Sequence, residues 1–157
     1  MRVEGHRRSV RRGGAEDCAE RVAALARELG VSDRLAMVGL RTDVENVYGA
    51  ADLVAVPSTA PDPLPGTAIE AAAAGCAVLA ADHGGLPEII RDGTTGRLFA
   101  PGDASAMARV AAALLGDPLI RGQLGTAAAD DVRTRFAPEL LTDRIGVLYA
   151  AVLATRR

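Results

Sequence analysis

Two carboxylates, Asp62 and Glu70, lie eight positions apart in the segment PSTAPDPLPGTAIEAAAAGC, residues 57–76. Between them a Pro/Gly loop enters a predicted helix at residues 66–68, where free N–H groups and the helix dipole favour an anion such as phosphate. Glu70 lies roughly 5 Å further along the helix, where its carboxylate can accept hydrogen bonds from ribose hydroxyls. Asp62 can do the same for a hexose. The arrangement suits a nucleotide sugar, a ligand built from sugar, diphosphate and ribose.

The same acidic residues have ordinary structural explanations. Thr67 and Glu70 match the T-x-x-E capping box, which needs no ligand. Asp62, between two prolines, is a common turn residue, and Glu88 in a first helical turn compensates the helix dipole. The spacing alone leaves both explanations open.

Other reactive side chains give weaker signals. His83 is one of two histidines, and we expect at most a hydrogen bond donated to the ligand. Ser58 lacks the G-x-S-x-G context of a serine nucleophile. Cys18 and Cys76 match no metal-ligand or redox spacing, so we expect no metal site and a reducing compartment.

A parallel sheet would bring these loops together. Apolar runs predict strands at 34–40, 52–58, 76–82 and in GRLFAPGD, 96–103, and predicted helices alternate with them. Strands that are apolar on both faces indicate a sheet covered on both sides. We therefore expect an α/β fold, a Rossmann-like open parallel sheet of four to five strands with helices on both faces. Ligands of such sheets bind beyond the carboxyl ends of the strands, here at loops 39–42, 58–66 and 82–85.

The two ends of the chain have different characters. Residues 1–14 are arginine-rich and are either a disordered start or the remnant of a strand. Residues 15–157 are expected to form one nucleotide-sugar-binding domain with a helical C-terminal part. Its helices begin at a T-x-x-E box formed by Thr42 and Glu45, at Asp103, at Asp117-Pro118 and at Pro138.

Composition narrows the class of partner. The 157 residues are 49% apolar, enough to bury one core, whereas 3% aromatic content and a formal charge of −2 argue against nucleic acid. No apolar run reaches the roughly 18 residues that span a bilayer. We expect a cytoplasmic protein without a transmembrane segment, and the basic start leaves peripheral contact with lipid headgroups open.

A family resemblance sharpens this interpretation. The segments DLVAVPS, 52–58, and DPLPGTAIEAAAAGCAVLAADHGGLPEIIRDGTTGRLFAPGD, 62–103, resemble the donor-binding domain of retaining GT-B glycosyltransferases of the large group 1 (GT4-type) family. That pattern runs from a strand ending in Pro-Ser through E-x7-E, G-G-x-x-E-I and D-G-x-x-G to P-G-D. Its order and spacing match from about residue 34 to residue 117.

The resemblance assigns roles to particular residues. It implies that Glu70 binds the ribose hydroxyls and that Asp62, one methylene shorter than the usual Glu, contacts the transferred sugar. Main chain around Gly39 and Leu40 would meet the base, and Arg41 and His83 lie on loops of the same rim. The main chain that would surround the sugar and diphosphate comprises Leu64, Pro65, Gly66, Thr67 and Ala68.

The implied activity is retaining transfer of a hexose from a UDP-, GDP- or ADP-sugar, with no metal or other cofactor. We expect the chain to be the C-terminal half of a GT-B fold, truncated at its N-terminus, with the acceptor held by a missing or separate domain. The alternative is a non-catalytic half that binds nucleotide sugars weakly or mediates interactions through an unpaired sheet edge. Epimerases and phosphorylases share the fold, but D-G-x-x-G and P-G-D favour a transferase.

Overall fold

Each strand of the sheet lies within one of the predicted apolar runs. In the computed structural model, which describes residues 13–155, β1 (Val54–Val56), β2 (Val78–Ala81) and β3 (Arg97–Phe99) pair in the order β1-β2-β3. Both pairings are parallel, with Val54 opposite Val78 and Leu79 opposite Arg97. All four residues of β2 are buried. Because alternate side chains point to opposite faces, both faces of the sheet are covered, as predicted.

The expectation of four to five strands is wrong for residues 13–155, which contain three. The run at 34–40 forms no strand, and its Met37, Val38 and Leu40 are exposed. A strand needs a neighbour for its backbone N–H and C=O groups, and apolar composition does not supply one. The expected strand remnant near the N-terminus lies outside the described residues.

Helices occupy most of the remaining chain. They are α1 (Gly13–Glu28), α2 (Val44–Ala50), α3 (Gly66–Ala73), α4 (Leu86–Ile89), α5 (Ala104–Gly116), α6 (Pro118–Arg135) and α7 (Pro138–Ala154), with a 3₁₀ turn η1 (Ser32–Arg34). The predicted caps of α5 and α6 are confirmed, since Asp103 accepts a hydrogen bond from Ala106 N and Asp117 accepts one from Ile120 N. The predicted box at Thr42 is wrong, because α2 begins one residue later with Asp43 as its N-cap.

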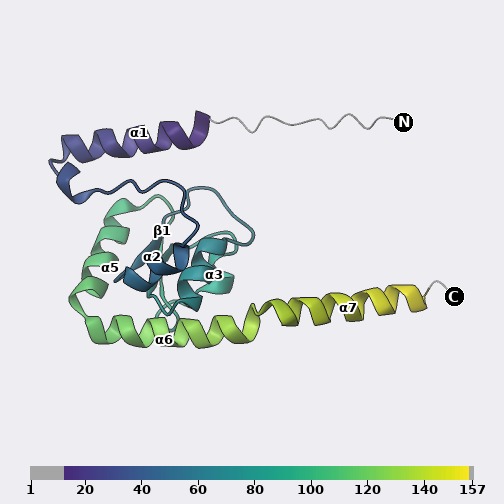
Figure 1. Ribbon diagram of the computed structural model, residues 1–157. Coiled ribbons are helices and arrows are strands. Elements are labelled where there is room, and N and C mark those ends of the chain that lie inside the picture. Colours follow the sequence, from purple (N-terminus) through teal and green to yellow (C-terminus); the bar gives the residue numbers. More distant parts are fainter. Residues whose placement is uncertain (1–12, 156–157) are drawn as a thin grey trace, which may run out of the picture. The chain divides into compact units, whose positions relative to one another are not determined.

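The chain divides between Thr42 and Asp43 into two compact units. The first contains α1, whose Val22 and Leu25 are exposed. The turn after α1 contains the exposed Leu29 and Gly30, which has a left-handed conformation with φ 67°. The second contains the sheet and α2 to α7. In Figure 1, α5 and α6 border the group formed by β1, α2 and α3.

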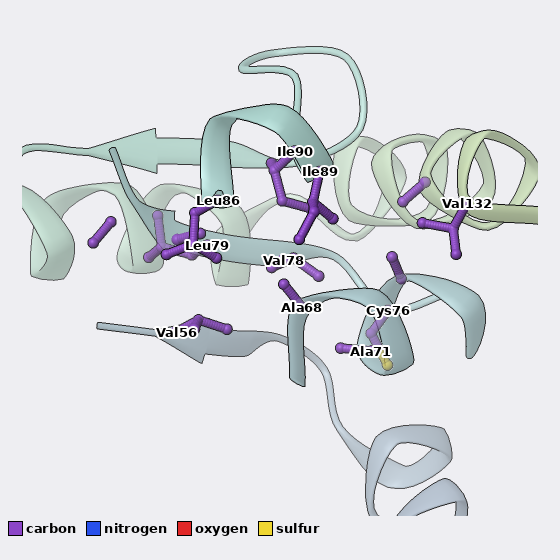
Figure 2. Close-up of a cluster of buried hydrophobic side chains, with 14 of the residues drawn as sticks. Val56, Ala68, Ala71, Cys76, Val78, Leu79, Leu86, Ile89, Ile90 and Val132 are labelled. Carbon is purple, nitrogen blue, oxygen red and sulfur yellow. The ribbon is translucent and has the colours of Figure 1, made fainter. Parts of the chain in front are cut away.

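The core of the second unit forms where α3, α4 and α6 meet β2 (Figure 2). Ala68, Ala71 and Ala72 of α3 are fully buried. Their small side chains let α3 pack closely on the sheet and on α6. The helix that carries Glu70 is therefore fixed along its buried face.

A carboxylate organises the turn between α4 and β3. Asp92 Oδ1 accepts hydrogen bonds from Arg97 Nε at 2.9 Å and from Leu98 N at 2.8 Å. Burial opposes ionisation of Asp92, but these hydrogen bonds outweigh it and hold the pKa of Asp92 below its ordinary value. A pKa lowered by folding stabilises the protein above the unfolded pKa, and this stabilisation is lost as pH falls through the folded pKa.

Replacing Asp92 by asparagine is expected to lower the free energy of unfolding by about 0.5–1 kcal/mol near pH 7, a modest loss because the side chain is half exposed. The loss should begin to shrink as pH falls below about 4, the ordinary pKa of an aspartate, and should disappear once the pH is below the lowered pKa of folded Asp92, where the wild-type carboxylate is itself protonated. Urea unfolding of both proteins at neutral and acid pH measures the difference. An equal loss at both pH values would contradict the assigned role of the charge.

Candidate functional site

The loops that follow β1 and β2 pack against each other, as expected for the carboxyl edge of a parallel sheet. Gly85 N donates to Asp62 O at 2.8 Å, and the His83 ring bonds Ser58 O at 2.8 Å. The third expected loop belongs to the first unit, so the roles of Gly39, Leu40 and Arg41 stay predictions.

Two glycines allow this close contact between loops. A Cβ at Gly85 would lie 2.1 Å from Pro63 O, and one at Gly84, φ 59°, would lie 2.7 Å from Asp62 O. The function of these glycines is therefore to admit the backbone of residues 61–63.

Asp62 forms the turn that its proline neighbours suggest. Its Oδ1 accepts a hydrogen bond from Leu64 N at 3.0 Å, which is an Asx turn. The N–H of Leu64 is therefore occupied within the protein. A contact between Asp62 and a transferred sugar stays a prediction, and Oδ2 is the oxygen that this turn leaves available.

The first turn of α3 presents a smaller set of donors than the sequence suggested. The helix begins at Gly66 with Pro65 as its N-cap and no side-chain cap, so the Thr67–Glu70 capping box does not form. Pro65 has no N–H, and Ala68 N donates to Pro65 O at 3.1 Å. Within the described residues, the N–H groups of Gly66 and Thr67 have no protein acceptor. These two donors can bind an anion at the positive end of the helix dipole.

Glu70 is held by a residue that sequence reasoning missed. The Tyr48 hydroxyl, on α2, donates to Glu70 Oε2 at 3.1 Å, while Oε1 lies beside Gly66, 3.7 Å from where a Cβ would stand there. Burial, followed by this bond to Glu70, raises the pKa of the Tyr48 phenol, and a hydrogen bond with Thr67 acts in the opposite direction. The capping-box explanation of Glu70 is therefore wrong. No local pattern marks Tyr48, which lies 22 positions away.

His83 already uses one ring nitrogen inside the protein. Because a carbonyl oxygen only accepts hydrogen bonds, Nε2 carries the proton in its bond to Ser58 O. The neutral ring then offers Nδ1 as an acceptor. A hydrogen bond donated by the ring to a ligand, as the sequence predicted, requires the imidazolium.

Residues 18–155, whose side chains the structure describes, contain no group of three or more His, Cys, Asp or Glu side chains that could hold a metal ion. None of the helices in this part of the chain is both long enough and apolar enough to cross a bilayer. Both cysteines are free, Cys18 exposed and Cys76 buried.

Solved structures with the same architecture are GT-B glycosyltransferases. HepE of Anabaena, crystallised with UDP, superposes with a TM-score of 0.85 and 27% identity, covering 88% of this chain and 38% of that chain. Sucrose-phosphate synthase from Thermosynechococcus elongatus gives a TM-score of 0.81 and 33% identity, covering 88% of this chain and 35% of that chain. The described fold is thus part of a GT-B fold.

The sequence matches the family of glycosyl transferases group 1 over residues 13–131, and the chain belongs to this family. One relative, the D-inositol 3-phosphate glycosyltransferase of Mycobacterium sp. (strain KMS), is 44% identical over 98 residues. That alignment covers 61% of this chain and 22% of the relative, so the chain spans about a fifth of its length.

Proposed function

We propose that this chain binds the nucleotide-sugar donor of a retaining glycosyltransferase. In this proposal the diphosphate lies at the first turn of α3, Glu70 binds the ribose hydroxyls, and Asp62 contacts the transferred sugar. The observation that carries it is the position of Glu70. Its carboxylate is held beside a helix N-terminus where the N–H groups of Gly66 and Thr67 have no acceptor among residues 13–155, at the edge where parallel sheets bind ligands.

The geometry favours recognition over acid–base catalysis by the two carboxylates. Glu70 and Asp62 each accept a hydrogen bond from the protein, which orients each of them as an acceptor for a ligand hydroxyl. As the glycosidic bond breaks, negative charge develops on the departing diphosphate. The N–H groups of Gly66 and Thr67 and the α3 dipole would stabilise that charge without a metal, while the acceptor attacks the face that the diphosphate leaves.

The acceptor is proposed to be bound by another part of a longer protein. The chain spans about a fifth of the length of its mycobacterial relative. Helix α7 also carries exposed Leu141, Ile145, Leu148 and Val152, whose spacing places them on one face of the helix. Such a face suits contact with another folded part. The HepE complex makes UDP the first nucleotide to test.

Isothermal calorimetry with UDP, UMP and uridine tests the proposal. We expect UDP to bind with a dissociation constant below about 1 mM, because a ligand that joins the α3 N-terminus to Glu70 makes several charge-assisted hydrogen bonds. UMP should bind about tenfold more weakly and uridine more weakly still, because each loses phosphate contacts at α3. GDP and ADP, measured in parallel, identify the preferred base. The proposal would be rejected if none of these nucleotides bound with a dissociation constant below about 1 mM.

A further inference from the structure

The hydrogen bond between Tyr48 and Glu70 has no evident value for stability. Glu70 is exposed, and a hydrogen bond at an exposed site adds little to folding because water competes for both partners. Yet the bond crosses from α2 to α3 and joins residues 22 positions apart. Its effect is on geometry: it selects one orientation of the Glu70 side chain.

Both the side chain and the backbone carbonyl of Tyr48 are held in place. Its side chain is half-buried and packs on the main core of the second unit. Its carbonyl oxygen accepts hydrogen bonds from Cys76 Sγ at 2.8 Å and from Ala51 N at 3.1 Å. Cys76 is buried just before β2, and burial raises the pKa of its thiol, which keeps the thiol protonated as a donor. Tyr48 is therefore held through its backbone carbonyl by hydrogen bonds and through its side chain by packing on the core.

This orientation of the Glu70 side chain directs its second carboxylate oxygen to the first turn of α3. With Oε2 bound to Tyr48, Oε1 is left beside Gly66 in the first turn of α3. This is the turn whose Gly66 and Thr67 N–H groups have no acceptor in the described part of the chain. A glutamate that is not held would spread over many rotamers, and ordering it on binding would cost conformational entropy.

We propose that Tyr48 is a positioning residue for donor recognition, which holds the Glu70 carboxylate in the orientation that accepts hydrogen bonds from the ribose hydroxyls. This inference rests on the proposed function and adds a residue that acts through Glu70. The recognised chemistry is the vicinal diol of the ribose. A nucleotide without that diol gains nothing from the arrangement.

The test compares UDP with 2′,3′-dideoxy-UDP by calorimetry on the full chain. Tyr48→Phe keeps the packed ring and removes the hydroxyl. We expect it to weaken UDP binding about three- to tenfold, the effect of releasing one ordered side chain. Binding of the dideoxy nucleotide should change less than about twofold, so that the preference for ribose falls. Tyr149→Phe, the same change at the other tyrosine, which is exposed on α7, should alter neither affinity.

A second variant separates positioning from a general disturbance. In a Glu70→Ala background, Tyr48→Phe should have no further effect on UDP binding, because two residues that act as one unit are not additive. Additive losses, or equal losses for both nucleotides, would overturn the inference. The inference would also be overturned if the wild-type chain bound UDP more tightly than 2′,3′-dideoxy-UDP and Tyr48→Phe left that ratio of affinities unchanged. Failure of the wild-type chain to bind UDP at all would instead reject the proposed function, and the role of Tyr48 with it.

Discussion

Replacing Glu70 by alanine is expected to weaken UDP binding by about 30- to 100-fold, or about 2–3 kcal/mol. The change removes the acceptor of two charge-assisted hydrogen bonds to the ribose while leaving the α3 N–H groups in place. Because the donors for the diphosphate remain, the residual affinity should still depend on the second phosphate. Calorimetry with UDP and UMP measures both effects.

The fold should tolerate this substitution. Glu70 is exposed, the one described hydrogen bond of its side chain is to Tyr48, and alanine favours the helix. The free energy of unfolding should change by less than about 1 kcal/mol. Glu45→Gln is the matched control, since it also removes one negative charge from an exposed position, in the first turn of α2. A Glu70→Ala protein that binds UDP as tightly as the control would contradict the ribose role.

The sequence predicted those parts of the fold that depend on local chemistry. Asp103 and Asp117 mark helix starts because each side chain satisfies a backbone N–H three residues later. The strand expected at 34–40 fails because pairing requires a distant partner that no local pattern encodes. The Thr67 box fails for a different reason: Pro65 ends the loop with φ −69°, so that Gly66 already begins the helix.

In the candidate site, too, the local features could be predicted from the sequence and the contacts between distant segments could not. Glu70 and the α3 N-terminus were predictable because a helix start and a carboxylate one turn later are separated by a fixed distance. Tyr48 was not, because its contact with Glu70 follows from the packing of α2 against α3. The glycines at 84 and 85 could be recognised as sites of close approach, but only the structure identifies the approaching chain as residues 61–63.

The largest expected effect on stability arises behind α3, where α6 crosses the turn that leads from α3 into β2. Gly125 of α6 is buried, and a Cβ there would lie 2.1 Å from Gly75 O. The flexible end of a side chain could move away, but this atom belongs to the backbone. Gly75 is further fixed by its left-handed φ of 79° and by its N–H, which donates to Ala72 O. Relief of the clash therefore requires α6 to separate from α3.

Gly125→Ala is accordingly expected to lower the free energy of unfolding by about 2 kcal/mol or more, since overpacking outweighs the gain of about 1 kcal/mol in helix propensity. Gly122→Ala, one turn earlier in α6, is the control: Gly122 is exposed, and a Cβ there meets nothing within 4 Å. That variant should be more stable than wild type by up to about 1 kcal/mol. Urea unfolding measures both changes, and shifts of the two midpoints in the same direction would contradict the argument. Opposite shifts would show that the backbone contact behind α3, and not glycine content, holds the helix that carries Glu70.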